Sequence, residues 1–197
     1  KMTNNKGLLI ILSAPSGCGK DTVFKAIKDL RNDVVESISA TTRKPREGEV
    51  EGVNYYFKSE SDFQLMVVND ELLEYARYNN CYYGTPVSEV EKAINDGKIC
   101  FLIIDVQGAQ SILKVRPDAI SIFLLPPSLD VLEKRLINRS TNDSEDVKNR
   151  MKIAQREIDM APLYKYIVVN DDLNECVNKI NDIINKELLT LNSKEIK

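Results

Sequence analysis

The sequence predicts an α/β fold built on a parallel sheet that is covered by helices on both faces. Five short apolar runs are expected to be buried strands, and several of them are apolar throughout instead of alternating, which is typical of strands buried on both faces. Helical patterns with one apolar face lie between several of these runs, and alternating strands and helices indicate a parallel sheet. The 197 residues, 43% of them hydrophobic, are enough for one domain with a sizeable core.

The core elements follow from these runs in chain order. Strands are expected at Leu8–Ser13, Val34–Ser39, Cys100–Ile104, Ile120–Leu125 and Tyr166–Val169. Apolar residues at helical spacing predict helices at Thr22–Arg31, Leu129–Ile137 and Asp172–Leu191. We therefore assign residues 7–35 and 92–190 to the core, and the last residues, 191–197, to a frayed tail.

The alternation breaks between residues 36 and 91. Asn54–Phe57 and Tyr82–Tyr83 carry strand-like aromatics, Glu71–Tyr78 lies between them, and Ser61–Val68 has a helical pattern. This stretch is expected to form a small mixed α+β insertion on the sheet. A second interruption, Asn138–Asp146, is almost without apolar residues and lies between two helical patterns. It predicts a mobile lid over about residues 138–150.

Composition excludes several classes of protein. Twenty-seven Lys and Arg against thirty Asp and Glu leave a formal charge of −3, so a nucleic-acid partner is not expected. Because the chain has no histidine, Ser-His-Asp and Cys-His hydrolases and His-ligated zinc sites are excluded. No apolar run approaches a membrane span, and the four cysteines form no C-x-x-C pair. A cytoplasmic location with reduced cysteines is the expectation.

A phosphate-binding loop is predicted directly after the first strand. Gly17 and Gly19 let the backbone turn its N–H groups inward, and Lys20 adds a full positive charge at the start of a helix. A strand before and a helix after are the context that a P-loop requires. The nucleotide-binding residues expected here are Ala14, Pro15, Ser16, Gly17, Cys18, Gly19, Lys20, Asp21 and Thr22.

Two positions depart from the G-x-x-x-x-G-K-[ST] pattern. Ala14 replaces the first glycine, and Asp21 replaces the Ser or Thr whose hydroxyl normally binds Mg²⁺. A carboxylate beside polyphosphate is repulsive unless it faces the metal or its waters, or points away. Thr22 can supply the hydroxyl from one position later, so Asp21 and Thr22 are both open as the metal-binding residue. Cys18 is interpreted as a small space-filling residue, not a nucleophile.

A second phosphate site is predicted in the insertion. Arg43 and Arg46 lie near a Pro-Arg-Glu-Gly turn, and two guanidinium groups that converge suit a phosphate monoester dianion. The alternative is a charged turn in which these arginines bridge to Glu47 and Glu49. Beside a P-loop, we favour the second phosphate site.

The arginine-rich stretch has a distinctive spacing: Ser39-x-Thr-Thr-Arg43-x-x-Arg46-x-Gly48-Glu49-x-x-Gly52-x-x-Tyr55-x-Phe57. Together with Ala14-Pro-Ser-Gly-x-Gly-Lys20, it resembles the guanylate kinase family. The resemblance extends over about residues 7–190, through Glu74, Tyr83-Gly84-Thr85, Asp105-x-Gln107-Gly108, Arg135-x-x-x-Arg139, Arg150 and Val169-Asn170-Asp171-Asp172. It implies a three-layer P-loop core and Mg²⁺-dependent transfer of the γ-phosphoryl group of ATP to GMP, and to dGMP, without a covalent enzyme intermediate.

The resemblance also implies roles for single residues. Ser39, Arg43, Arg46, Tyr55 and Tyr83 would hold the GMP phosphate. Glu74 and Thr85 would read guanine, whose N1–H and N2–H are adjacent donors that one carboxylate can accept. Adenine has no N1–H, so AMP would leave Glu74 unpaired. Rival functions are a peptide-binding scaffold, which typically loses the phosphate loop, and a kinase for another nucleoside monophosphate.

The remaining candidates lie around the predicted cleft. Asp105 follows a strand at the edge where α/β sheets bind ligands. It would bind waters of Mg²⁺ or the acceptor nucleotide. The family often has a second acid two residues earlier, where this chain has Ile103. With Thr22, Asp105 is the candidate metal residue. Asn170 would contact adenine, or could be a turn residue before the last helix. For Arg156, a salt bridge is the favoured reading. The proposed catalytic cations are Lys20, Arg43, Arg135, Arg139 and Arg150.

Overall fold

The computed structural model describes residues 6–138 and 144–195. A five-stranded sheet forms the core in the order β2-β7-β1-β8-β9, and all its strand pairs are parallel. The strands are β1 (Leu8–Ser13), β2 (Val34–Glu36), β7 (Ile99–Ile103), β8 (Ile120–Leu125) and β9 (Tyr166–Val169). The predicted α/β class with a parallel core is therefore confirmed. Strand β2 ends at Glu36, before the predicted Ser39, because the chain leaves the sheet there for the insertion.

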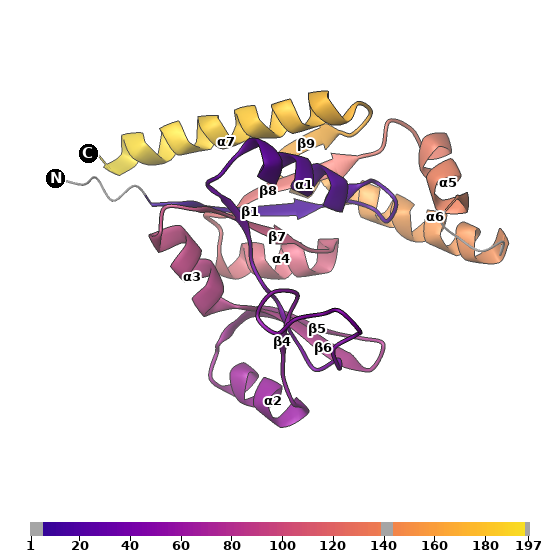
Figure 1. Cartoon of the computed structure of the whole chain (residues 1–197). Coiled ribbons are helices and arrows are strands. Elements are labelled where there is room, and N and C mark those ends of the chain that lie inside the picture. The colour runs from indigo at the N-terminus through magenta and orange to yellow at the C-terminus, as the bar shows by residue number, and fades with distance from the viewer. Residues whose placement is uncertain (1–5, 139–143, 196–197) are drawn as a thin grey trace.

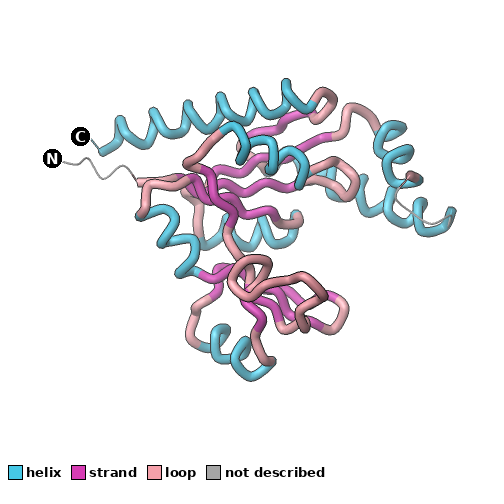
Figure 2. The backbone as a smooth tube through the Cα atoms, viewed as in Figure 1, coloured by secondary structure: helices cyan, strands magenta, loops and turns pink. Residues whose placement is uncertain are grey.

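Helices cover both faces of this sheet (Figures 1 and 2). One face carries α1 (Lys20–Leu30) and α7 (Leu173–Glu195), and the other carries α3 (Val87–Asn95) and α4 (Val106–Val115). Helix α5 (Leu129–Ile137) lies beyond the carboxyl ends of the strands, and α6 (Ser144–Asp159) returns from there to the core, where its Ala154 is buried. The short 3₁₀ helix Ala161–Leu163 follows α6, and its Ala161 belongs to the apolar cluster under α3 and α4. None of the helices in the described part of the chain has both the length and the apolarity of a membrane span.

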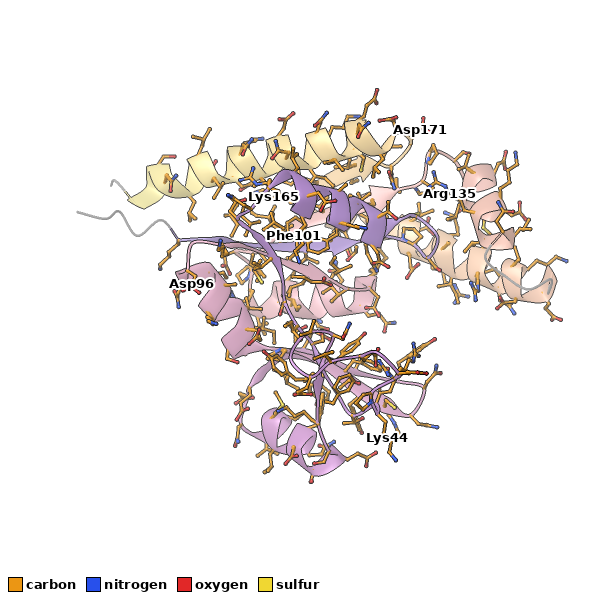
Figure 3. The ribbon with its side chains drawn as sticks, viewed as in Figure 1. Lys44, Asp96, Phe101, Arg135, Lys165 and Asp171 are labelled. Carbon is orange, nitrogen blue, oxygen red and sulfur yellow. The ribbon has the colours of Figure 1, made fainter. Side chains whose placement is uncertain are left out.

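Strand β1 explains why the core runs are apolar throughout. All six of its residues are buried. Leu8, Ile10 and Leu12 belong to the apolar cluster under α1 and α7, whereas Leu9 and Ile11 belong to the cluster under α3 and α4. Successive side chains of a strand point to opposite faces, so both sets must be apolar when both faces are covered. Figure 3 labels Phe101, a fully buried residue of the adjacent strand β7.

The insertion forms a second sheet with mixed strand directions, in the order β4-β3-β6-β5. Its strands are β3 (Ala40–Thr41), β4 (Tyr56–Phe57), β5 (Leu72–Tyr78) and β6 (Cys81–Pro86). Helix α2 (Glu60–Val68) packs on it through Phe63, whose ring stacks on Tyr82 with centroids 5.5 Å apart. Asn79 and Asn80 both have positive φ between β5 and β6, which suits a tight hairpin turn.

Two boundaries differ from the expected ones. Helix α3 starts at Val87, before the predicted end of the insertion at residue 91, and its Val90 and Ile94 are buried with Leu9 and Ile11 of the core strand. Helix α7 continues to Glu195, past the predicted start of a frayed tail at residue 191. Leu188 and Leu191 pack against the core cluster, and this burial extends the helix.

Candidate active site

The loop between β1 and α1 has the backbone of an anion-binding turn. Gly17 and Gly19 have φ values of 87° and 75°, a left-handed conformation that glycine adopts without a Cβ clash. Gly19 is the N-cap of α1 and provides no side-chain cap. The first N–H groups of α1 and the positive end of its dipole therefore remain available to a bound anion.

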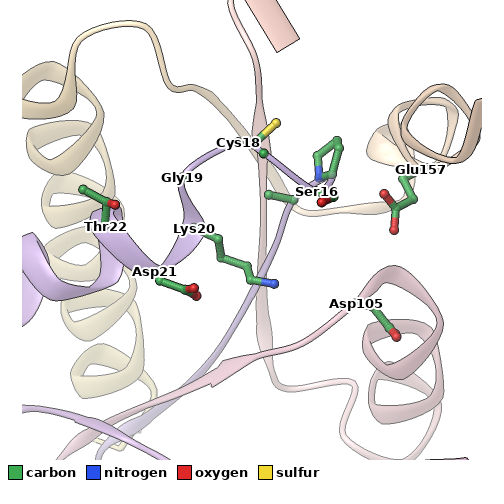
Figure 4. A pocket seen from close by; sticks show the side chains of 11 residues that line it. Ser16, Cys18, Gly19, Lys20, Asp21, Thr22, Asp105 and Glu157 are labelled. Atoms are coloured by element: carbon green, nitrogen blue, oxygen red, sulfur yellow. The ribbon is translucent and has the colours of Figure 1, made fainter. Parts of the chain in front are cut away.

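A cavity of about 310 Å³ opens in front of this loop. Figure 4 shows Lys20 extending into it, with Asp105 and Glu157 on the opposite wall. All nine residues predicted for the loop line the cavity, from Ala14 to Thr22. Asp21 and Thr22 are both exposed at the start of α1. The predicted loop residues are thus brought together around one space.

Cys18 has the packing role expected of it. Its side chain is 1% exposed and belongs to the core cluster under α1. Burial raises the pKa of the Cys18 thiol to about 12, although Arg135 and Lys20 act in the opposite direction. A thiol is a poor nucleophile until it ionises. Cys18 is therefore not an activated nucleophile at neutral pH.

Glu157 is a site residue that the sequence does not single out. Helix α6 carries it to the wall of the phosphate-loop cavity. Its Oε2 is buried and has no hydrogen-bond partner among the described residues. Burial raises the pKa of Glu157, the negative charge of Asp105 adds to this, and Lys20 opposes it. No sequence signal marked this position, because the path of α6 back to the sheet depends on tertiary packing.

A second cavity, of about 290 Å³, lies between the insertion and the core. Five predicted residues line it: Ser39, Tyr55, Glu74, Tyr83 and Asp105. Asp105 lines both cavities, since it is the N-cap of α4 at the carboxyl end of β7. Its Oδ1 accepts the Gly108 backbone N–H at 2.7 Å. The structure therefore joins the two predicted binding spaces through a single carboxylate.

Glu74, a half-buried residue that lines the second cavity, pairs with the buried Thr85. The Thr85 hydroxyl, 1% exposed, donates to Glu74 Oε1 at 2.9 Å. Burial raises the pKa of Glu74 from its ordinary value of 4.5; the bond from Thr85 lowers it, and the charge of Asp105 raises it further. Such a carboxylate has an unmet demand for donors, which a ligand with N–H groups can satisfy.

The turn that carries Arg43 and Arg46 contains one of the ion pairs of the alternative prediction, between Arg43 and Glu49. Arg43 donates to Glu49 through both Nη atoms, at 3.0 and 2.8 Å, and its guanidinium lies 5.3 Å from the centre of the Tyr55 ring. Arg43, followed by the Arg46 backbone N–H, lowers the pKa of Glu49 to about 2. Arg43 therefore adjoins the second cavity through Tyr55 without lining it, and the Arg46 side chain is exposed.

The structure describes two of the three arginines predicted to act from the lid side, Arg135 and Arg150. Helix α5 packs on the phosphate loop, because a Cβ on Gly17 would lie 3.2 Å from Leu132 and 3.1 Å from Leu136. Arg135 extends from this helix near the loop, as its influence on Cys18 indicates (Figure 3). Arg139 lies outside the described residues. Arg150 forms an exposed ion pair with Asp146 at 2.9 Å, one turn away on α6.

The salt bridge favoured for Arg156 is not among the ion pairs of the described residues. Arg156 is exposed and lines a further cavity between α4 and α6, together with Ile153 and Met160. Glu157 lines the same cavity but uses its carboxylate toward the phosphate loop. Neighbouring positions on a helix point in different directions, so adjacency in sequence did not bring these two charges together.

Asn170 makes a contact that the sequence did not predict, and its adenine contact stays a prediction. Its side-chain amide donates to the backbone carbonyl of Cys18 at 2.7 Å, and the residue is 7% exposed. It precedes the last helix, which is capped by Asp172, whose Oδ1 accepts the Glu175 N–H at 2.9 Å. The amide predicted to contact adenine is thus bound to the phosphate loop.

Comparisons with known proteins agree with this arrangement. A family model described as guanylate kinase matches residues 6–187. The guanylate kinase of Rickettsia felis is 49% identical over 180 residues, covering 91% of this chain and 94% of its own. That of Enterococcus faecalis is 50% identical over 185 residues, covering 93% and 91%. The crystal structure of guanylate kinase from Anaplasma phagocytophilum superposes with a TM-score of 0.72 at 32% identity, covering 95% of this chain and 89% of that one.

The structure and the relatives point to the same family. The phosphate loop adjoins a second pocket through the Asp105 carboxylate, and the relatives are about 50% identical over nearly the whole length. The chain belongs to the guanylate kinase family of nucleoside monophosphate kinases.

Proposed function

We propose that this protein transfers the γ-phosphoryl group of ATP to GMP, and also to dGMP, giving ADP and GDP or dGDP. The observation that carries the proposal is the position of Asp105, which lines both the phosphate-loop cavity and the pocket of Glu74. Two nucleotides bound there would have their phosphates at a common boundary. The name guanylate kinase, carried by the relatives in Rickettsia felis and Enterococcus faecalis, supports GMP as the acceptor.

The loop residues Ala14–Thr22 would bind the ATP phosphates. The backbone N–H groups near Gly17 and Gly19 would donate to phosphate oxygens, and Lys20 would neutralise the terminal phosphates. Glu157 faces the same space. Burial raises the pKa of its carboxyl group, and the positive charge of Lys20 opposes that rise.

Glu74 would read guanine by accepting N1–H and N2–H together. Thr85 has one hydroxyl proton, which it donates to Glu74 in this structure. In this state Thr85 orients the carboxylate, and it can donate to guanine O6 only after its hydroxyl turns away from Glu74. The pair therefore supports recognition of guanine chiefly through the carboxylate.

The GMP phosphate would lie at the rim formed by Ser39, Tyr55 and Tyr83. Arg43 would reach it from behind Tyr55, and a phosphate dianion would compete with Glu49 for the guanidinium. Arg46, whose side chain is exposed, would turn inward to complete the site. Glu49 would therefore hold Arg43 beside Tyr55 through two hydrogen bonds.

Mg²⁺ is the cofactor that the family implies, and the residues present fit it. No group of three or more metal-binding side chains occurs in the described ranges. This agrees with Mg²⁺ bound mainly by phosphate oxygens and waters, with one or two carboxylates assisting. Asp105 and the unpartnered Oε2 of Glu157 face the loop and would bind those waters, and Thr22 would supply a hydroxyl. When bound, the ion neutralises charge on the β- and γ-phosphates.

The chemistry would be direct in-line transfer without a covalent enzyme intermediate. Lys20 would hold the phosphoryl group from the loop side, and Arg43 would hold the acceptor phosphate. Arg135 on α5 and Arg150 on α6, together with Arg139, would stabilise the charge that spreads over the migrating group. Closure would also exclude water and so prevent hydrolysis of ATP.

Acceptor specificity tests the proposal directly. In a coupled assay of ADP release with ATP and Mg²⁺, GMP and dGMP are expected to be phosphorylated, while AMP, CMP and UMP give rates at least roughly 100-fold lower. Only guanine offers two adjacent donors to Glu74. Faster turnover of another monophosphate would reject guanine recognition, and no turnover of any acceptor would reject the kinase assignment.

GMP affinity is expected to fall when the pH is lowered from 7 toward 5. The ionised form of Glu74 would bind the guanine donors, and burial raises its pKa from the ordinary 4.5, so it gains a proton and loses an acceptor at a higher pH than an exposed glutamate would. The Kd of GMP measured by calorimetry across this range provides the check.

The phosphate of GMP also titrates, with a pKa of about 6, so the variant E74Q serves as the control that separates the effect of the phosphate from that of Glu74. It retains the phosphate contribution and lacks the carboxylate. A pH dependence as steep in E74Q as in the wild type would assign the effect to the phosphate alone.

A further inference from the structure

A single side chain from the far end of the sheet holds the phosphate loop. Asn170 follows β9, and its Nδ2 donates to the carbonyl of Cys18, 152 positions earlier in the chain, at 2.7 Å. The Asn170 backbone N–H donates to Leu125 at the end of β8, at 2.9 Å. Asn170 is therefore fixed by two strands and is 7% exposed. A buried side chain with this anchoring can set the position of its partner.

The contact has a geometric consequence for the next peptide N–H. In a trans peptide the C=O of Cys18 and the N–H of Gly19 point in opposite directions. Because the carbonyl points at Asn170, the Gly19 N–H points away from it. A Cβ on Gly19 would lie 3.1 Å from Asn170 Nδ2, so the loop also packs directly on the amide. Both Cys18 and Gly19 line the phosphate-loop cavity.

We propose that Asn170 is a positioning residue for the phosphate loop: it fixes the Cys18–Gly19 peptide so that the Gly19 N–H is presented to a bound polyphosphate. This inference rests on the proposed function. It differs from an adenine contact, because its effect falls on the phosphates and is independent of the base. An aspartate at this position is nearly the same size but has no donor, and its carboxylate would repel the Cys18 carbonyl.

The experiment compares the variants N170D and N170A with the wild type by calorimetry, in the presence of Mg²⁺. The probes are ATP, inorganic tripolyphosphate, which has no base, and GMP. Affinities for ATP and for tripolyphosphate are expected to fall by the same factor, roughly tenfold or more, while the affinity for GMP is unchanged. Should N170D not fold, N170A provides the same comparison, since it also lacks the donor.

S121A is the matched control for a purely structural loss. Ser121 is 3% exposed, and its hydroxyl accepts the Lys165 N–H at 2.9 Å, within the same sheet but outside the two binding cavities. It should lower thermal stability and leave tripolyphosphate binding intact.

The possible outcomes separate the two proposals. A loss of ATP affinity without loss of tripolyphosphate affinity would identify Asn170 as an adenine contact and overturn the positioning role. Unchanged binding of all three probes, or equal losses for GMP and tripolyphosphate, would also overturn it. Failure of the wild-type protein to bind tripolyphosphate and ATP would count against the proposed function itself, and the positioning role would fall with it.

Discussion

Replacing Lys20 with alanine is expected to lower kcat for GMP phosphorylation by roughly 100-fold or more. Lys20 extends into the phosphate-loop cavity and faces Asp105 and Glu157 across it. Without its charge, those two carboxylates and the triphosphate would repel one another, and the charge of the migrating phosphoryl group would lose a fixed partner. Steady-state turnover at saturating ATP and GMP measures this effect.

Lys25 provides the matched control, because it is an exposed lysine on the same helix that does not line the cavity. K25A is expected to turn over like the wild type. GMP binding to K20A, measured separately, is expected to persist, since Lys20 does not line the pocket of Glu74. Near-wild-type turnover of K20A would contradict the assignment of the loop as the site of the transferred phosphate.

Much of the core could be predicted because its constraints are local. Strand β1 is buried on both faces, so every residue from Leu8 to Leu12 must be apolar, and the run is visible without any structure. The phosphate loop is equally local: Gly17 and Gly19, both with positive φ, and Lys20 lie close together in the sequence. Helices α3 and α4 were not assigned individually from the sequence, and the expected insertion boundary fell inside α3.

The positions of Glu157 and Asn170 could not be predicted because they depend on tertiary packing. Glu157 reaches the phosphate loop only through the direction in which α6 returns to the core. Asn170 lies one residue after β9, and the loop that it contacts follows β1, from which β9 is separated by β8. A sequence motif singles out Asn170 but does not say which atom its side chain contacts.

The arginine turn shows how a prediction with two alternatives resolves. Both readings used the charge of Arg43, one for a substrate phosphate and one for a neighbouring carboxylate. Glu49 lies six positions later, and the turn between them, with Gly48 at a φ of 83°, brings its carboxylate onto the guanidinium. The structure shows the intramolecular pair, and the substrate phosphate at this turn stays a prediction.

Glu74 illustrates how the fold gives meaning to an unremarkable residue. In the segment Leu72–Tyr78 it would be read as a surface position on a strand, yet burial raises its pKa and Thr85 donates to it. The pairing of β5 with β6 brings these two side chains together. The carboxyl end of β7 adds Asp105 to the same pocket.

Replacing Glu74 with alanine or glutamine is expected to lower kcat/KM for GMP by roughly 100-fold or more while leaving the Kd of ATP unchanged. Alanine removes both acceptor oxygens. Glutamine keeps one acceptor oxygen but places its amide NH₂ opposite the second guanine donor, so one guanine N–H has no acceptor. Because Glu74 lines the acceptor pocket and not the phosphate-loop cavity, the effect should be confined to the acceptor.

The ratio of kcat/KM for GMP to kcat/KM for AMP is the sharper measurement, because a loss of folded protein lowers both values equally and leaves their ratio unchanged. In the wild type, AMP would leave the Glu74 carboxylate without N–H partners. In E74Q the amide can match adenine about as well as guanine, so the ratio of kcat/KM for GMP to kcat/KM for AMP should fall toward one. Glu71 is an exposed acid near the start of the same strand, and E71Q should preserve the ratio. If E74Q weakened GMP and ATP equally, or kept the wild-type ratio, guanine would have to be recognised by other groups in the pocket.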